Sequence, residues 1–460
     1  MEIINKPSHL KGVLKTRHVS MLALGSALGA GLFVGSSTVI ASTGPGAFIT
    51  YALTGIIVAL VMRMLGEMAA AHPTTGSFVE YARLAFGRPA AYMTGWLYWY
   101  FWVIVVGFEA VVGGQIINAW LPDIPVWVIA LGLMIGMTLL NLLSVRSFGE
   151  AEYWFAGIKV VAILVFIGVV IYFIFGDKSN STVSLSNLTQ HGGFLPHGVG
   201  SLFAGVVVVI FSMTGMEVAT LAAAESDNPS RNIRKVANAV IFRIMIFYVL
   251  AVFLIVVAQP WTDITVGKSP FVTTLEHIGI PGAGTILTAV ILVAVLSVLN
   301  AGLYTASRVL FILASNDEAP RSMATLNRKG VPVRGVIAST LVGYGCVIIA
   351  ALWPDTVFQF LINSSGTVFL FVYLMICLSQ LKLRSKWVSQ GTLKFAVWGH
   401  PWVPMIVIAA IVAVLVSMAL DPVLQISLLQ CGITIFALAV CYLVRGGKKN
   451  QFSAVPEKKT

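Results

Sequence analysis

Long apolar stretches separated by short polar segments follow one another along most of this chain. A helix needs about 20 apolar residues to cross the hydrocarbon core of a bilayer. Twelve stretches, numbered here as spans one to twelve, are long enough: 19–43, 47–71, 89–120, 125–145, 152–176, 197–223, 236–258, 283–314, 335–353, 356–381, 403–420 and 424–444. Because lipid offers no partner for backbone hydrogen bonds, they predict an all-α polytopic membrane protein with about twelve transmembrane helices.

Composition and charge agree with this class and give the chain an orientation. Hydrophobic residues make up 58% of the chain and charged residues 10%, and its mean hydropathy is +0.91, which excludes an ordinary soluble domain. With the N-terminus inside, cytoplasmic segments hold 23 of the 29 Lys and Arg residues, and the outer loops hold only Lys178 and Lys268. This bias predicts a multi-pass protein of the cell membrane with both termini cytoplasmic. It also explains the net charge of +11 better than a nucleic-acid partner does.

Two predicted spans carry helix-breaking residues in their middle. Span one contains GSALGAGLF at 25–33, and span six contains FSMTGMEVAT at 211–220. Glycine inside a helix costs roughly 1 kcal/mol relative to alanine, and a broken backbone in the membrane must face protein, water or a ligand. Such glycines can instead serve only close helix packing. The offset of five spans favours a binding site, because spans an odd number apart cross in opposite directions, as an inverted repeat requires.

This repeat predicts how the chain is divided. Two inverted repeats of five helices each would contain the broken spans one and six, and spans eleven and twelve would lie outside them. The predicted parts are a cytoplasmic tail at 1–18, the first repeat at 19–176, the second repeat at 197–381, two peripheral helices at 403–444 and a second cytoplasmic tail at 445–460.

The two interruptions offer backbone groups for a zwitterion. Where span one unwinds, free N–H groups at Gly29, Ala30 and Gly31 can bind a carboxylate. Carbonyl groups of both breaks can accept hydrogen bonds from an ammonium group. The candidate substrate-binding positions on the breaks are Ser26, Ala27, Gly29, Ala30, Gly31, Phe211, Ser212, Thr214 and Gly215. Span one contains no Asp or Glu, which argues against a monoamine without a carboxylate.

Lys159 in span five is the main candidate for energy coupling. The chain has no GxxxxGK[ST] phosphate loop, so an ion gradient must drive any uptake against a gradient. A charge within a span costs roughly 2.5–3.5 kcal/mol on insertion scales, so Lys159 is expected to face the bundle interior. Burial makes proton release from a lysine feasible. The alternative is a permanent cation that pins helices together and never titrates.

Four further charges lie within predicted spans. Arg63 and Glu67 are four residues apart near the cytoplasmic end of span two, which indicates a helix pair or a gate contact. Glu109 in span three could contact the ligand, relay a proton or be a protonated core residue. An ionised Glu109 in the pocket would favour an amine far from the carboxylate, as in an ω-amino acid. For Glu217 in span six, a gating or proton role is favoured.

A few aromatic residues complete the candidate site. Consecutive positions of the aromatic run in span three cannot all face one way, and Tyr98 and Trp102, one turn apart, are the pair we expect to line the pocket. Tyr304 lies three positions before Ser307 in span eight, on a similar face. The histidines show no HExxH spacing and the four cysteines no CxxC spacing, so the sequence predicts no metal site and no cofactor other than the proton as coupling ion.

Several motifs resemble those of one transporter family over nearly the whole chain. These stretches are TRHVSMLALGSALGAGLFVGSS, MRMLGEMAAAHPTTGSF, LNLLSVRSFGEAEYWFAGIKV, FSMTGMEVATLAAAESDNP and LYTASRVLFILASNDEAP. They are similar to the amino acid permeases of the amino acid/polyamine/organocation superfamily, and GWLYWYFWVIVVGFEA and GLYTASRVLFILA are most similar to bacterial γ-aminobutyrate permeases. The resemblance implies the leucine-transporter fold and proton-coupled uptake of an amino acid.

The resemblance also implies roles for individual residues. The substrate carboxylate would meet the amides of Ala30 and Gly31, and its amine would meet the carbonyl groups of Ala27, Phe211, Ser212 and Thr214. Phe211 would also form an aromatic lid. Lys159 would reach the unwound part of span one near Ser26 and the hydroxyl group of Ser307 in span eight, in the place where sodium-driven relatives hold a sodium ion.

Three function classes follow. The favoured one is a proton-coupled permease (symporter) that takes up an amino acid, γ-aminobutyrate or a similar small one first, with alanine, glycine, proline, aromatic or basic amino acids as alternatives. Sodium coupling is disfavoured because the ammonium group of Lys159 would occupy the sodium position. A non-transporting amino acid sensor would keep the same binding backbone. An enzyme is disfavoured, since the chain has no nucleophile elbow or metal-ligand cluster. The expected partners are an amino acid and the lipid bilayer, with no obligate protein partner evident.

Overall fold

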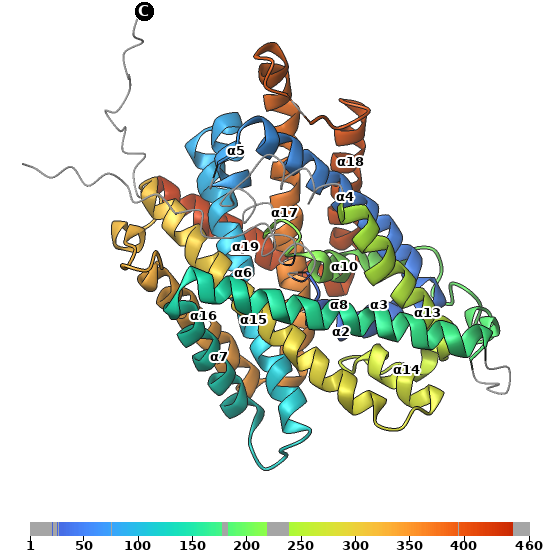
Figure 1. Cartoon of the computed structure of the whole chain (residues 1–460). Coiled ribbons are helices and arrows are strands. Elements are labelled where there is room, and N and C mark those ends of the chain that lie inside the picture. Colours follow the sequence, from blue (N-terminus) through green and yellow to red (C-terminus); the bar gives the residue numbers. More distant parts are fainter. Residues whose placement is uncertain are drawn as a thin grey trace, which may run out of the picture.

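The computed structural model shows a bundle of helices, several of which cross one another obliquely (Figure 1). It describes Met21, Gly25 and residues 27–74, 76–176, 183–218, 239–393 and 395–444, and this part of the chain contains no β-strand. The α-helices are α2 (Ala30–Phe33), α3 (Ser36–Thr43), α4 (Ala47–Ala71), α5 (Ser77–Phe86), α6 (Arg88–Asn118), α7 (Val126–Leu143), α8 (Val145–Phe175), α9 (Ser201–Ala204), α10 (Val206–Met213), α13 (Ala251–Ala258), α14 (Pro270–Ile278), α15 (Ala283–Ser315), α16 (Val333–Leu352), α17 (Pro354–Ser389), α18 (Trp402–Leu420) and α19 (Pro422–Val444). Short 3₁₀ segments are η1 (Gly44–Gly46), η2 (Leu185–Leu188), η4 (Trp261–Asp263) and η5 (Arg321–Ala324), and η3 (Ile244–Leu250) is a π-helix.

Ten described helices are long and apolar enough to cross a membrane. The twelve predicted spans correspond to these ten helices, because two predicted spans form one helical segment and a third predicted span contains only a shorter helix. Spans one and two join into one continuous segment, Ala30–Ala71, because η1 connects α3 directly to α4. Span six is represented by the shorter apolar segment Ser201–Met213, because its helix stops in the middle of the predicted span.

Several helices are longer than the apolar stretches that predicted them. The fifth span begins at Val145 in α8, seven residues before the predicted start, and α17 continues to Ser389 beyond the predicted end of span ten at residue 381. Polar residues continue a helix once its neighbours cover them, so the apolar stretch marks the membrane segment and not the helix end. Figure 1 shows α8 running across the face of the bundle.

Helices five spans apart pack against each other. The helix α2 of span one contacts α10 of span six, α4 contacts η3 of span seven, α6 contacts α15, and α7 contacts α16. Contact between helices five spans apart agrees with the expectation of an inverted five-plus-five repeat. The last pair, α8 and α17, is separated: α8 packs on α15 and α13, and α17 packs on α4, α5, α6 and α10.

The helix α6 lies at the centre of the bundle and contacts α15, α16 and α17. Glycines permit its close approaches. A Cβ atom at Gly302 of α15 would lie 3.0 Å from the ring of Trp102, and one at Gly107 of α6 would lie 2.4 Å from Cβ of Cys346. The helices α18 and α19 pack mainly on each other and on α17, and few of their described side chains are buried.

Candidate functional site

Span one is broken between its two halves, as its glycines predict. Gly25 is helical, residues 27–29 are not, and α2 begins at Ala30. Gly29 is extended, with φ −131° and ψ −162°, and the N–H group of Leu28 closes a turn on the carbonyl oxygen of Gly25 at 3.1 Å. The predicted binding residue Ser26 lies outside the described residues.

Span six is broken after Met213, where α10 ends. Thr214 is extended, with ψ 153°, and Gly215 follows with φ +101°, a backbone conformation that strongly favours glycine. The carboxylate of Glu217 accepts a hydrogen bond from the N–H group of Gly215 at 3.0 Å. This side chain therefore holds the broken backbone from within the same segment; residues 219–238, which include the end of predicted span six, lie outside the description.

The two breaks meet in the middle of the bundle. A Cβ atom at Gly31 would lie 2.7 Å from Cα of Ser212 and 3.1 Å from the ring of Phe211. Glycine at this position therefore lets the backbones of the two broken spans touch. Phe211 is buried over α2, and the ring of Phe108 packs on it edge to face with ring centroids 5.2 Å apart.

Glu109 reaches the first break from α6. Its carboxylate oxygens lie 3.2 Å and 3.4 Å from the N–H group of Ala30, and the side chain is buried. The amide of Ala30 is the group expected to bind a substrate carboxylate. Glu109 therefore lies at the carboxylate end of the expected site rather than at a distal amine position, and its role in transport stays a prediction.

Tyr248, which no pattern in the sequence singled out, joins the two breaks. Its hydroxyl group on η3 lies 2.7 Å from the carbonyl oxygen of Ala27 and 3.0 Å from that of Ser212. These are two of the carbonyl groups expected to bind an ammonium group. The only sequence signal was a hydroxyl group within the apolar span seven, the partner of span two in the repeat.

Lys159 extends from α8 to the first break, as predicted. Its ammonium group donates to the carbonyl oxygen of Gly25 and, at 2.9 Å, to the hydroxyl group of Ser297 on α15. The expectation that Lys159 binds the hydroxyl group of Ser307 was wrong. Ser307 lies ten residues further along α15, about 15 Å at 1.5 Å per residue, and its hydroxyl group bonds to the carbonyl oxygen of Tyr304.

Glu152, which the sequence pattern did not single out either, extends this buried polar network. Ser297 donates to one of its carboxylate oxygens at 2.7 Å, and Asn300 donates to the other at 3.0 Å. Asn141 of α7 in turn donates to the side-chain oxygen of Asn300 at 2.7 Å. Glu152 stood at the predicted edge of span five, but α8 begins earlier and the side chain is buried.

The predicted aromatic pair in span three lies beside the second break. The hydroxyl group of Tyr98 donates to Glu217 at 3.0 Å, so it links α6 to the segment after α10. Trp102 packs edge to face on Tyr98, with ring centroids 6.2 Å apart, and is buried. Tyr304 lies elsewhere on α15: its ring stacks on Phe148, and the guanidinium group of Arg308 lies 3.3 Å from its centroid.

Glu67 does not have Arg63, its expected helix neighbour, as its closest cation, and the alternative of a gate contact stays a prediction. Glu67 forms its ion pair with Arg384 of α17 at 3.1 Å and accepts a further bond from Gln380 at 2.8 Å. Arg63 lies over the ring of Phe395, 4.6 Å from its centroid. Contacts with distant segments outweigh the neighbour one turn away, because the buried carboxylate gains several donors from them. Glu67 thus fastens α4 to α17.

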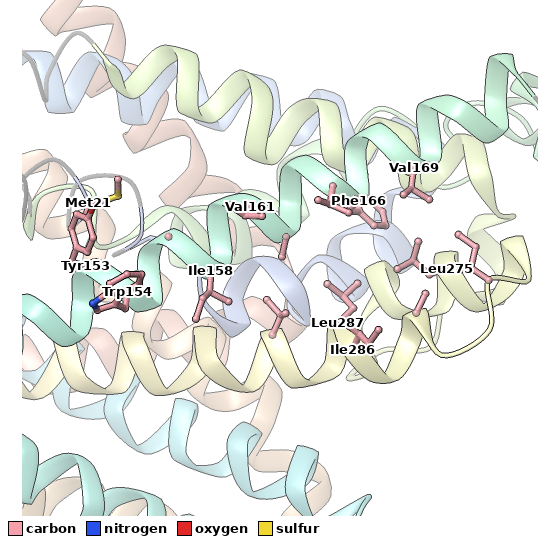
Figure 2. Close-up of a pocket in the computed structure, with 16 residues that line it drawn as sticks. Met21, Tyr153, Trp154, Ile158, Val161, Phe166, Val169, Leu275, Ile286 and Leu287 are labelled. Atoms are coloured by element: carbon pink, nitrogen blue, oxygen red, sulfur yellow. The ribbon is translucent and has the colours of Figure 1, made fainter.

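An apolar groove lies apart from the two breaks (Figure 2). It has a volume of about 690 Å³ and is lined by α8, α14 and α15. Trp154 on its wall is 66% exposed, and Ile286 is 69% exposed. The described residues that line this groove are almost all apolar.

Known proteins are similar to this chain over almost its whole length. Residues 18–453 match the family model for amino acid permeases. The chain is 48% identical to the gamma-aminobutyric acid permease of Bacillus subtilis (strain 168), over 95% of this chain and 94% of that protein. It is 42% identical to the gamma-aminobutyric acid permease of Escherichia coli (strain K12), over 93% of each. It is 38% identical to the aromatic amino acid transport protein AroP of Escherichia coli (strain K12), over 95% of this chain and 96% of that protein.

Proposed function

Because the chain belongs to the amino acid permease family, we propose that it couples amino acid uptake to the proton gradient, with γ-aminobutyrate as the favoured substrate. It is a multi-pass membrane protein of the cell membrane and an amino acid transporter. The bias of Lys and Arg along the sequence supports cytoplasmic termini at both ends.

One observation supports the substrate site: the side chains that bond to the two breaks are a donor and an acceptor, as are the ammonium and carboxylate groups of an amino acid. A hydroxyl group, from Tyr248, donates to the carbonyl oxygens of Ala27 and Ser212, and a carboxylate, from Glu109, accepts from the amide of Ala30. A substrate ammonium group can replace the hydroxyl donor, and a substrate carboxylate can replace the acceptor. A phenol has one proton for the two carbonyl groups, whereas an ammonium group has three and can donate to both at once.

The same contacts provide for alternating access. The two breaks touch at Gly31 and Ser212, so a substrate bound to both would move spans one and six together. Tyr98 and Glu217 connect the second break to α6, and we assign this contact to the gate. Tyr304 stacks on Phe148 near the start of α8, and we assign this contact between α15 and α8 to a second gate.

Lys159 supports proton coupling. When it is protonated, its charge strengthens the hydrogen bond to the carbonyl oxygen of Gly25 and ties the first half of span one to α8 and α15. A neutral amine would hold this carbonyl group more weakly and release the mobile helix. Protonation of Lys159 is therefore the step that would link proton entry to movement of span one.

The substrate is proposed from the relatives. Two of those compared are named gamma-aminobutyric acid permeases and are 48% and 42% identical to this chain, whereas the aromatic amino acid transport protein is 38% identical. These values favour γ-aminobutyrate over an aromatic substrate. The backbone site itself binds only the groups that all amino acids share.

Uptake into proteoliposomes tests the proposal. Radiolabelled γ-aminobutyrate would be offered with an inward proton gradient, no sodium and a panel of unlabelled amino acids as competitors. We expect concentrative uptake that a protonophore abolishes, with γ-aminobutyrate as the strongest competitor. Stronger competition by an α-amino acid would overturn the substrate, a requirement for sodium would overturn the coupling ion, and binding without uptake would indicate a sensor.

A further inference from the structure

A row of buried hydrogen bonds leads away from Lys159 toward the start of α8. It runs from the ammonium group to Ser297 at 2.9 Å and from Ser297 to Glu152 at 2.7 Å. Lys159, Ser297 and Glu152 are all fully buried. A buried polar network of this kind is costly unless every member is satisfied, and here each one has a partner.

Donor chemistry sets the direction of these bonds. An ammonium group can only donate, so Ser297 accepts from Lys159 and directs its own proton to Glu152. Asn300 presents its amide nitrogen to Glu152 because its side-chain oxygen accepts from Asn141. Donors from two sides therefore meet the Glu152 carboxylate.

We propose that Glu152 accepts the proton of Lys159 through the hydroxyl group of Ser297, an inference that rests on the proposed proton coupling. In this step an N–H bond of Lys159 breaks as its proton forms an O–H bond on Ser297. At the same time the original O–H bond of Ser297 breaks, and that proton forms an O–H bond on Glu152. The ammonium group becomes a neutral amine, the carboxylate becomes a neutral acid, and Ser297 is unchanged.

The position of Glu152 gives the step a direction. Glu152 lies seven residues before Lys159 on α8, about 10 Å along the helix at 1.5 Å per residue. With a cytoplasmic N-terminus, as proposed above, this is the cytoplasmic side of Lys159. A proton that enters with the substrate would thus move from Lys159 toward the compartment into which it is released.

Glu109 is the other carboxylate near Lys159, but its contacts suit a different task. Among the described residues its hydrogen bonds go to the amide of Ala30, where the substrate carboxylate is expected. Glu152 is joined to Lys159 by a single hydroxyl group, and its hydrogen bonds within the described part of the chain go to Ser297 and Asn300 rather than to either break. Proton release through Glu152 would therefore leave the substrate contacts intact.

Two measurements on the full-length protein in proteoliposomes test this step. One is net uptake of γ-aminobutyrate driven by an inward proton gradient. The other is exchange of external labelled for internal unlabelled γ-aminobutyrate without a gradient, which needs no net proton release. Glu152→Gln is expected to reduce net uptake by about 100-fold, the lower range for loss of a positioned proton acceptor, and to preserve exchange.

Ser297 supplies a second, independent variant. Ser297→Ala removes the relay and should reproduce the loss of net uptake with exchange preserved, whereas Ser297→Thr keeps a hydroxyl group and should restore net uptake. Ser339→Ala is the matched control, because it removes an equally buried hydroxyl group that bonds to Trp99 outside this network. It should leave the ratio of net uptake to exchange unchanged.

The remaining outcomes separate the two proposals. Wild-type protein that exchanges but does not concentrate γ-aminobutyrate in a proton gradient would overturn proton coupling and, with it, this step. Proton-driven wild-type uptake with Glu152→Gln equally active would overturn the role of Glu152 alone. Loss of exchange together with net uptake in Glu152→Gln and Ser297→Ala would also overturn it, because the network would then serve folding only.

Discussion

The hydroxyl group of Tyr248 lies 2.7 Å from the carbonyl oxygen of Ala27, and this bond ties span seven to the break in span one. The same hydroxyl group lies 3.0 Å from the carbonyl oxygen of Ser212 in span six. Spans one, six and seven thus share one proton donor. When spans one and six move away from Tyr248, their two carbonyl groups need another donor.

Removal of the Tyr248 hydroxyl group should increase the stabilisation of the protein by its substrate. Tyr248→Phe leaves two buried carbonyl groups without their donor, at a cost of about 1–3 kcal/mol each. We expect a lower midpoint of thermal unfolding without γ-aminobutyrate and a larger upward shift on its addition than in the wild type. Tyr373→Phe is the control, since the buried hydroxyl group of Tyr373 has no hydrogen-bond partner among the residues that the structure describes. Equal shifts in both variants would contradict the proposed exchange of donors.

The contact between the two breaks leaves no room for a methyl group at Gly31. In Gly31→Ala the new Cβ would lie 2.7 Å from Cα of Ser212, a backbone atom that cannot rotate away. Such overpacking costs about 1–3 kcal/mol or more, and we expect uptake to fall at least about tenfold. Gly168→Ala on α8 is the control, because its Cβ meets nothing within 4 Å. Normal uptake by Gly31→Ala would show that the breaks need not touch.

Replacement of Glu109 tests which end of the substrate this side chain faces. An ionised Glu109 about 4 Å from the substrate carboxylate would cost about 4 kcal/mol at an effective dielectric constant of 20. Glu109→Gln should therefore lower KM by about tenfold or more, and by the same factor for γ-aminobutyrate and for an α-amino acid that the wild type also transports. KM values of both substrates in both proteins give the answer. A selective loss of γ-aminobutyrate transport would instead place Glu109 at the distal amine.

The ion pair between Glu67 and Arg384 should stabilise the protein without any part in substrate binding. Glu67 is fully buried, so Arg384→Ala leaves a buried carboxylate without its cation, which typically costs about 3–5 kcal/mol. We expect a lower thermal midpoint in detergent and partial recovery in the double variant Glu67→Gln with Arg384→Ala. Arg321→Ala removes an exposed pair with Asp317, whose arginine side chain is 86% exposed, and should change nothing. An equal fall of the thermal midpoint in Arg384→Ala and Arg321→Ala would contradict a stabilising role of the pair between Glu67 and Arg384.

The sequence alone was sufficient for the class of fold and for the places where it is interrupted. Apolar length follows directly from bilayer thickness, and a glycine in a membrane helix carries a cost that needs a reason. The same physics singled out Lys159, because a charge within a span is expensive wherever the helix lies. These features need no knowledge of which helices are neighbours.

The partners of these groups were decided only by the tertiary structure. Ser297 binds Lys159 in place of Ser307, and Tyr248 joins the breaks, because helix crossing determines which turn of one helix faces another. A hydroxyl group in a span carries no comparable signal, since it can satisfy itself on the preceding turn of its own helix, as Ser307 does on Tyr304. Charges and glycines in a membrane span are therefore conspicuous in the sequence, whereas the side chains that complete their hydrogen bonds become evident only when the helices are packed.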